Sequence, residues 1–290
     1  MKHVFSGTGV ALVTPFNPDS SIDYEGLEVM VNNVIDNNID YIVALGTTAE
    51  TPTLSFAERK QILKKIVRFT NKRVPVVVGI GCNNPIEVIE QIHFFDLKNV
   101  DAVLSVTPYY NRPQQEGIIA HYKAIAQESP LPIIIYNVGS RTAVNIEAET
   151  TLRIAKEIPK VIGIKEASGN LNQIMNVINR KPKDFLVISG DDALTLPLLA
   201  CGADGVISVV ANAYPDKFSE MVRLALDGNF EKARKIHYQL LPIIHACFKE
   251  GSPAGVKTFL ALQEKIKANV RLPLTEVSLS LSKEIKKLLS

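Results

Sequence analysis

The chain of 290 residues is 46% hydrophobic and 21% charged, with a net charge of +2, a composition typical of a soluble globular protein. This charge balance excludes the strong field of nucleic-acid or membrane-surface binders, and no apolar run is long enough to span a membrane. The cysteines Cys82, Cys201 and Cys247 are odd in number and widely spaced, which indicates a reducing compartment. Because the chain also begins without an apolar leader, we expect a cytoplasmic protein.

Short apolar runs alternate with amphipathic stretches along the first two thirds of the chain. We expect strands at 9–14, 41–45, 75–79, 101–106, 132–136, 161–166, 185–189 and 205–209. We expect helices at 23–37, 55–69, from 84 onward, 115–127, 147–157 and 171–179, with a short one that ends at 202. Three of these helices begin with cap signals, namely Asp23, the Ser55–Glu58 pair, and Asn84 before Pro85.

The strands are near-continuous Val, Ile and Leu runs, as in parallel strands buried on both faces. About eight strand–helix units predict a (β/α)8 TIM barrel over residues 1–214. A doubly wound sheet competes, but it more often has fewer strands and a glycine-rich turn, of which Gly79-Ile80-Gly81 is only a fragment. Residues 215–290 predict a C-terminal helical extension, with helices near 216–226, 230–248, 253–265 and 277–289.

In such a barrel, chemistry lies at the mouth, the end formed by the loops that follow the strands. The polar residues expected there are Thr47, Thr48, Tyr109, Tyr110, Tyr136, Lys165, Asp191 and Asp192. An enolase-type magnesium site needs carboxylates at the ends of adjacent strands, and strands four and five end in Thr-Pro-Tyr and Tyr-Asn instead. The two aspartates after the seventh strand would repel a phosphate, which disfavours a phosphosugar. The histidines have no HExxH spacing, so we expect no metal and no cofactor. Since a phosphosugar is disfavoured, we expect the substrate to be an unphosphorylated keto acid.

Lys165 lies near the end of the apolar run 161–166. Burial disfavours the ammonium form, and the neutral amine is a nucleophile towards carbonyl groups. The alternatives are a lysine that extends to solvent from the strand end, or one that pairs with a carboxylate.

The other candidates also have ordinary interpretations. Tyr136 can pass protons during imine formation or can be a plain aromatic at the mouth. Thr47 and Thr48 can be turn residues, and Arg141 can bind a substrate carboxylate or form a surface salt bridge. Glu58 and Glu87 are better explained as helix caps.

Several motifs together point to one family. They are 46–50 (GTTAE), 107–113 (TPYYNRP), 136–142 (YNVGSRT), 163–170 (GIKEASGN) and 189–192 (SGDD). In this order the chain resembles the dihydrodipicolinate synthase family of pyruvate-dependent Schiff-base aldolases, from about residue 7 to 212 and more loosely to 273.

The resemblance implies that Lys165 forms a Schiff base with pyruvate. The resulting enamine attacks L-aspartate-4-semialdehyde, a step towards lysine and diaminopimelate. The implied proton relay is Tyr136, Thr47 and Tyr110, with Tyr110 reaching in from a neighbouring subunit of a homotetramer, a dimer of tight dimers. Thr48 is implied for the pyruvate carboxylate, Arg141 for the semialdehyde carboxylate, and Ile207 for a backbone carbonyl that faces the site.

The resemblance also implies a feedback pocket for lysine at the dimer interface. Asn83, Glu87 and Tyr109 match that pocket, whereas Phe56 and Arg59 stand where inhibited members often carry histidines. Two further departures concern loops: Ala49 replaces a usual glycine, which costs strain if that position has positive φ, and Gly139 replaces a usual proline.

Two other functions compete with the synthase. N-acetylneuraminate lyase and keto-deoxy-sugar-acid aldolases share the lysine and the tyrosine, but Arg141 and the run 109–113 favour the synthase. A non-catalytic barrel that binds a keto acid would tolerate replacement of Lys165, but lysine, tyrosine and threonine all fall at the catalytic end of the barrel.

Overall fold

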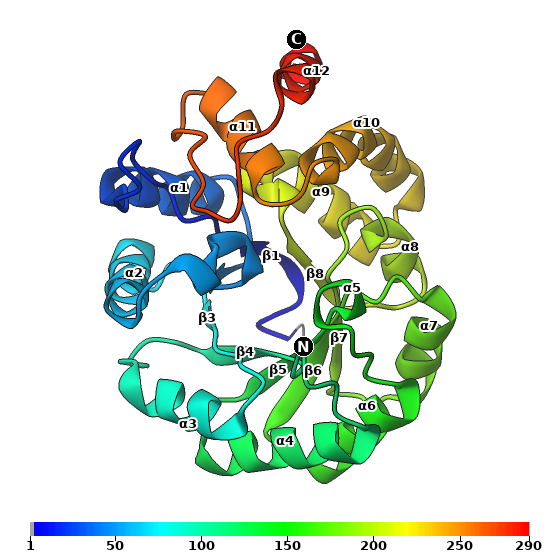
Figure 1. The fold of residues 1–290 in the computed structure, drawn as a ribbon. Coiled ribbons are helices and arrows are strands. Elements are labelled where there is room, and N and C mark those ends of the chain that lie inside the picture. Colours follow the sequence, from blue (N-terminus) through cyan, green and yellow to red (C-terminus); the bar gives the residue numbers. More distant parts are fainter. Residues whose placement is uncertain (1–2, 290) are drawn as a thin grey trace.

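Eight parallel strands close into a barrel. The computed structural model describes residues 3–289, and each strand pairs with the next, while the eighth pairs with the first. The strands are β1 (Gly7–Ala11), β2 (Tyr41–Ala44), β3 (Val76–Gly79), β4 (Ala102–Val106), β5 (Ile133–Asn137), β6 (Val161–Glu166), β7 (Leu186–Ser189) and β8 (Gly205–Ser208). Figure 1 shows them as a central ring, which confirms the predicted (β/α)8 barrel.

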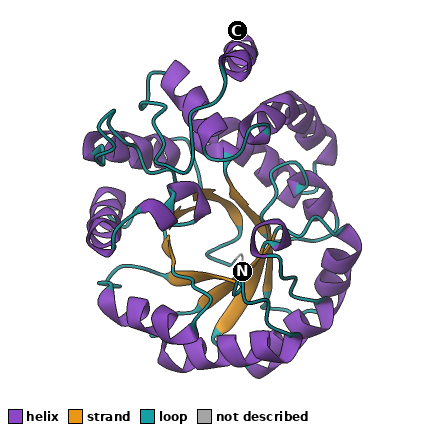
Figure 2. Cartoon of the chain, viewed as in Figure 1, coloured by secondary structure: helices purple, strands orange, loops and turns teal. Residues whose placement is uncertain are grey.

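Helices surround this ring (Figure 2). The α-helices are α1 (Tyr24–Asp36), α2 (Phe56–Thr70), α3 (Pro85–Phe94), α4 (Gln115–Glu128), α5 (Gly139–Thr142), α6 (Ala148–Glu157), α7 (Leu171–Arg180), α8 (Thr195–Ala200), α9 (Pro215–Leu226), α10 (Phe230–Phe248), α11 (Ala254–Leu262) and α12 (Leu279–Leu289). Short 3₁₀ helices are η1 (Thr47–Ala49), η2 (Thr51–Thr53) and η3 (Val210–Asn212). The sequence predicted only a turn where the four-residue α5 lies.

The cap signals begin the helices where they were expected. Asp23 accepts the Gly26 amide ahead of α1, at 2.8 Å, and Asn84 accepts the Ile86 amide ahead of α3, at 3.0 Å. Ser55 and Glu58 form the reciprocal capping box of α2. Each cap satisfies an amide that the first helical turn leaves without an intrahelical partner.

The interior of the barrel is filled at the end where the strands begin. Tyr41 crosses the interior, and its hydroxyl donates to the Val206 carbonyl at 3.3 Å. Gly9 makes this crossing possible, because a Cβ there would lie 2.3 Å from the Tyr41 ring. Phe5 packs edge-on against the same ring and is buried. This end of the barrel is therefore closed by side chains, and chemistry is expected at the mouth.

The C-terminal helices cover one side of the barrel (Figure 1). Among them α9 packs against β1, β8, α1 and α8, so it completes the ring of helices that covers the strands. The division into a barrel of residues 1–214 and an extension of residues 215–290 stays a prediction, and this packing places α9 with the barrel. Residues 3–289 contain no helix that is both long and apolar enough to cross a membrane.

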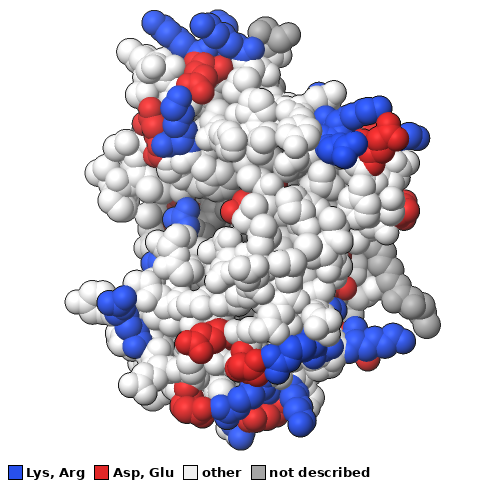
Figure 3. Space-filling view, turned by 90° about the vertical axis from the view of Figure 1, so that its right-hand side faces the viewer, with Lys and Arg blue, Asp and Glu red and all other residues white. Residues whose placement is uncertain are grey.

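Charges of both signs are mixed on the surface. Figure 3 shows one face, where basic and acidic side chains lie together at the upper and lower ends and few lie between them. This face therefore presents no broad field of one sign, as the net charge of +2 leads one to expect.

Candidate active site

Lys165 enters the barrel from β6. It is in register with Tyr136 on β5 and with Ile188 on β7. Because successive strand residues face opposite sides, Lys165 faces inward whereas Ile164 and Glu166 face the surrounding helices. Tyr136, Ile188 and Ile207 belong to the cluster that fills the barrel interior.

The amine of Lys165 lies over the face of the Tyr136 ring, 4.3 Å from its centroid. The lysine is only 6% exposed, so it does not extend into solvent. Within residues 3–289 its amine has no carboxylate within ion-pair distance and no hydrogen-bond partner. Both ordinary interpretations of Lys165 are thereby excluded, and its amine stays free to react.

Gly190 gives the Lys165 side chain its room. A Cβ at position 190 would lie 3.0 Å from Cε of Lys165 and 2.8 Å from Cβ of Ala167. The sequence placed Gly190 in a family motif without a role, and its position directly after the seventh strand was the available signal.

Glu166 fixes the ends of β5 and β6 to each other from the outer side of the barrel. Its carboxylate accepts the Asn137 side-chain amide at 3.1 and 3.2 Å and the Ser168 backbone amide at 2.8 Å. Burial raises the pKa of this carboxyl group. The bonds hold Tyr136 and Lys165, which precede Asn137 and Glu166 directly, in adjacent register. The sequence reading missed this role of Glu166 and Asn137.

The two threonines lie in η1 at the end of β2. Thr48 is 5% exposed and Thr47 is exposed, and neither hydroxyl has a hydrogen-bond partner in the described part of the chain. Ala49 does not have positive φ, so the strain considered for it does not arise. The left-handed residue is instead Glu50, with φ 57°.

Arg141 and Ile207 belong to different strand–loop units, since Arg141 follows β5 and Ile207 lies in β8. Arg141 lies in α5, is exposed, and its guanidinium pairs with no residue in the range 3–289. Ile207 is 1% exposed in β8, and the turn after it is held by Asp192, which accepts the Val209 and Val210 amides at 3.1 and 2.9 Å. Burial raises the pKa of Asp192 to about 6.

Tyr110 is separate from this group within its own chain. Its side chain is 88% exposed, its φ is 73°, and its hydroxyl has no partner among the residues described. Positive φ is unusual for a bulky residue and marks a strained position.

Asn83, Glu87 and Tyr109 lie around Cys82, beside α3. The Cys82 thiol donates to the Glu87 carboxylate at 3.0 Å, and Asn84 donates to the same carboxylate at 3.4 Å. Asn84 caps α3, and no bond joins Glu87 to the Asn84 backbone in residues 3–289, so Glu87 is not the helix cap that the sequence suggested. Burial raises the pKa values of Cys82 and Tyr109.

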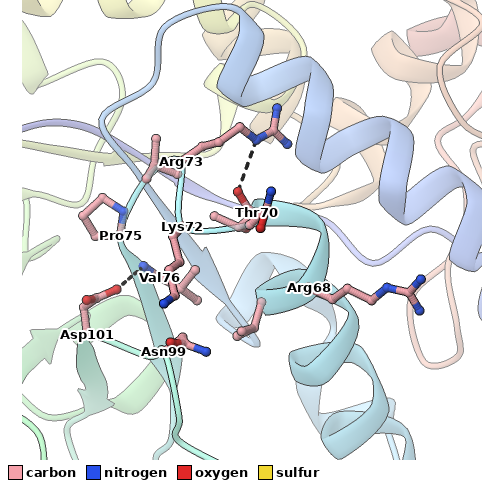
Figure 4. A pocket seen from close by; sticks show the side chains of 11 residues that line it. Arg68, Thr70, Lys72, Arg73, Pro75, Val76, Asn99 and Asp101 are labelled. Atoms are coloured by element: carbon pink, nitrogen blue, oxygen red, sulfur yellow. Dashed lines mark hydrogen bonds between the residues drawn. The ribbon is translucent and has the colours of Figure 1, made fainter.

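A cavity of about 520 Å³ lies elsewhere, at the end where the strands begin. Figure 4 shows Asp101 bonded to the Val76 amide and Arg73 bonded to the Thr70 carbonyl, while Arg68 extends away. This cavity lies at the opposite end of the barrel from Lys165, so it is not the reaction site. In the described range, no group of three His, Cys, Asp or Glu side chains is arranged to hold a metal ion.

The whole chain matches known proteins. The sequence model of the Dihydrodipicolinate synthetase family matches residues 4–290. Proteins named 4-hydroxy-tetrahydrodipicolinate synthase are 50% identical in Flavobacterium psychrophilum, over 97% of this chain and 96% of that protein, and 49% identical in Parabacteroides distasonis, over 98% and 95%. A crystal structure of a dihydrodipicolinate synthase is 46% identical, with a TM-score of 0.94 over 98% of each chain.

Three other solved structures bear on ligands and assembly. A chloride-inhibited dihydrodipicolinate synthase from Acinetobacter baumannii is complexed with pyruvate, at 39% identity and a TM-score of 0.95 over 98% of this chain and 97% of that one. The enzyme from Cyanidioschyzon merolae has lysine bound, at 35% identity and a TM-score of 0.95 over 99% and 98%. A third is a monomeric variant, at 37% identity and a TM-score of 0.96 over 99% and 96%.

These matches support the synthase and neither the sugar-acid aldolases nor a non-catalytic barrel. The family model and these relatives match nearly the whole length of the chain, and about half of the aligned residues are identical in the relatives. With the lysine and the tyrosine facing each other inside a closed barrel, the chain belongs to the dihydrodipicolinate synthetase family.

Proposed function

We propose that Lys165 is the nucleophile with which this chain, a lyase of the class I aldolase type, condenses pyruvate with L-aspartate-4-semialdehyde. The observation that carries the assignment is the position of its amine: buried, unpaired and 4.3 Å above the Tyr136 ring. The reaction belongs to lysine and diaminopimelate biosynthesis.

The amine of Lys165 adds to the C2 ketone of pyruvate, and loss of water gives the imine. The imine then loses a proton from its methyl carbon and becomes an enamine, whose carbon attacks the aldehyde of the second substrate. The amino group of that substrate closes the ring on the imine carbon and releases the Lys165 amine. Each transfer requires a group that gives and takes protons close to the reacting atoms.

Tyr136, Thr47 and Tyr110 form the proton relay in this proposal. The Thr47 hydroxyl and the Tyr110 hydroxyl are both without partners in the described chain, which leaves them available. Thr48 binds the pyruvate carboxylate and exposed Arg141 the carboxylate of the semialdehyde, since a guanidinium matches a carboxylate with two parallel bonds. The Ile207 carbonyl faces the imine. No metal or cofactor takes part.

The exposed Tyr110 supports a tight dimer in which it completes the partner's site. Phe56, Ile86 and Phe94 are also exposed, at 55%, 63% and 43%, and Phe56 packs edge-on against Phe94 at 5.9 Å. Exposed apolar side chains that gather in one region indicate an interaction surface. Two such dimers form the tetramer, and the assembly works in the cytoplasm.

The cluster of Asn83, Glu87 and Tyr109 is proposed as a feedback site for lysine. The Glu87 carboxylate offers a charge partner for a ligand ammonium, and its present partners are a thiol and an amide, not a cation. A hydrogen bond from a charged ammonium to this carboxylate is stronger than one from a neutral thiol or amide.

Borohydride trapping tests the nucleophile. Pyruvate and borohydride should add one reduced pyruvate to the peptide that contains Lys165, and the Lys165→Ala variant should stay unlabelled. Turnover of both substrates without any adduct on that peptide would rule the assignment out. Turnover of a sugar acid in place of the semialdehyde would instead change the substrate and leave the nucleophile in place.

A further inference from the structure

The turn that carries Thr47 and Thr48 ends on a buried acid. Glu50 is 2% exposed and has φ 57°, a conformation that costs energy for a residue with a side chain. Its backbone amide donates to the Thr47 carbonyl at 3.1 Å. The position of Glu50 is therefore linked directly to the position of Thr47.

The partner of Glu50 comes from the C-terminal part of the chain. Lys257, in α11, donates to Oε1 of Glu50 at 2.5 Å, and both side chains are fully buried. Lys257 also donates to the Asn269 carbonyl at 2.9 Å and lies over the Phe16 ring, 4.3 Å from its centroid. In Figure 1 the segment after α11 runs back beside the short helices that follow β2.

Arg271 extends the same connection. Its backbone amide donates to Oε2 of Glu50 at 2.9 Å, so both oxygens of this carboxylate are bonded to the C-terminal segment. Its guanidinium donates to the Glu58 carboxylate at 2.6 and 3.0 Å and to the Thr53 carbonyl at 3.0 Å. Bonds to the C-terminal segment are therefore made by the turn itself and by the start of α2.

We propose that Glu50 and Lys257 are positioning residues that hold Thr47 and Thr48 against the substrate, so that the C-terminal segment is a working part of the active site. The proposal rests on the proposed roles of these two threonines. Neither charged side chain touches the substrate, and both act through the turn.

The chemistry of the Glu50–Lys257 pair indicates that it orients the turn after β2 and does more than attach the C-terminal segment to it. A buried ion pair loses hydration on both sides, and well-packed apolar residues often hold two elements together as strongly. The ion pair also fixes the orientation of the Glu50 side chain, because each carboxylate oxygen accepts one donor. These two bonds together hold the strained backbone at Glu50 in place. Burial lowers the pKa of Lys257 to about 8, although the Glu50 carboxylate opposes this.

The experiment compares Glu50→Gln, Lys257→Met and the double variant with wild type. Lys249→Met is the matched control, because Lys249 pairs with Glu284 at 2.7 Å in the same region but both side chains are about half exposed. The readouts are kcat, KM for pyruvate, the rate of borohydride-trapped adduct on the Lys165 peptide, and thermal unfolding.

We expect each single variant to lower kcat/KM for pyruvate on the order of tenfold to a hundredfold, since small misplacements of reacting groups have effects of this size. The loss should include a higher KM, from Thr48, and a lower kcat, from Thr47, while saturating pyruvate still labels Lys165. The Lys249→Met control should keep both constants.

Unchanged kcat and KM in folded single variants that merely melt earlier would overturn the proposal and leave a structural tie. If the single variants fail to fold, the double variant decides, because it leaves no unpaired buried charge. A folded double variant with full activity would overturn the proposal, and one with the same losses would support it. Wild-type labelling tests the proposed function separately.

Discussion

Lys165 and Tyr136 are register partners on adjacent strands, and the amine of one lies 4.3 Å from the ring centroid of the other. Tyr136 therefore has two roles in the proposed site: the face of its ring packs against Lys165, and its hydroxyl can exchange protons. These two parts can be separated by replacing the hydroxyl alone.

Tyr136→Phe should keep the packing and lose proton transfer. General acid–base catalysis contributes on the order of 100-fold to 10,000-fold, so we expect kcat to fall within that range. Stopped-flow trapping with borohydride should find slower imine formation on Lys165 with little change in thermal stability. Imine formation at the wild-type rate would contradict the relay role of Tyr136.

Gly190→Ala should displace the lysine side chain. The added Cβ would lie 3.0 Å from Cε of Lys165 and 2.8 Å from Cβ of Ala167, so the lysine or its strand has to move. Overpacking of this kind costs about 1–3 kcal/mol of stability, which denaturant unfolding measures. We also expect kcat/KM for pyruvate to fall on the order of a hundredfold.

Gly117→Ala is the matched control for that change. Gly117 lies in α4, where a new Cβ meets only Pro113, at 3.3 Å, and alanine favours helix over glycine. The control should keep wild-type kinetics. If Gly190→Ala is as active as the control, Gly190 has no part in placing Lys165.

Tyr110 acts across a subunit interface if the dimer proposal holds, and mixing two inactive variants tests this. Lys165→Ala keeps Tyr110, and Tyr110→Phe keeps Lys165, so each mixed dimer contains one complete site. Random pairing makes half the dimers mixed, which predicts recovery of about a quarter of wild-type activity on a two-fold interface.

Mixing Lys165→Ala with Tyr136→Phe gives the control, since Lys165 and Tyr136 belong to one barrel and no complete site can form. This mixture should show no recovery. Absence of recovery in the Tyr110 mixture as well would place Tyr110 in its own chain's site or outside the relay.

His121 should make the fold sensitive to acid. Burial lowers the pKa of His121 to about 4 from its ordinary 6.5, and Nε2 has no hydrogen-bond partner. In the unfolded chain His121 therefore binds a proton below pH 6.5, whereas in the folded chain it binds one only below about pH 4. The free energy of unfolding falls as pH falls through that window, by no more than roughly 3–4 kcal/mol from this residue.

Urea unfolding at several pH values between those limits measures the effect. His121→Phe should flatten the decline, because phenylalanine keeps the ring contact with Tyr122 and cannot bind a proton. His93→Gln is the control, since His93 is more than half exposed. Equal acid sensitivity in all three proteins would exclude His121 as the cause.

The strand ends were predictable because each strand is a run of apolar residues and each run stops at a polar motif. The inward direction of Lys165 follows from that pattern, and so do the caps at Asp23, Ser55 and Asn84. Local signals of this kind need no knowledge of distant residues.

The contacts that hold the site in place were not predictable from one sequence. Glu50 and Lys257 are 207 positions apart, and neither residue type nor spacing indicates that they meet. The departure at Ala49 drew attention to the wrong residue, because the left-handed conformation falls on Glu50. Gly190 looked like an ordinary turn glycine, and only the folded side chain of Lys165 reveals why it has no Cβ.

Phe5 and Tyr41 fill the end of the barrel where the strands begin, and this has a consequence for how reactants reach Lys165. Because these two rings fill that end, we expect both reactants of the proposed reaction to enter, and both products, water and the cyclised acid, to leave at the mouth. In the proposed reaction the ketone has to arrive before the aldehyde, because the enamine that attacks the aldehyde forms only after the ketone has bound to Lys165. The proposed chemistry therefore fixes the order in which the two reactants bind, and both of them use the same opening.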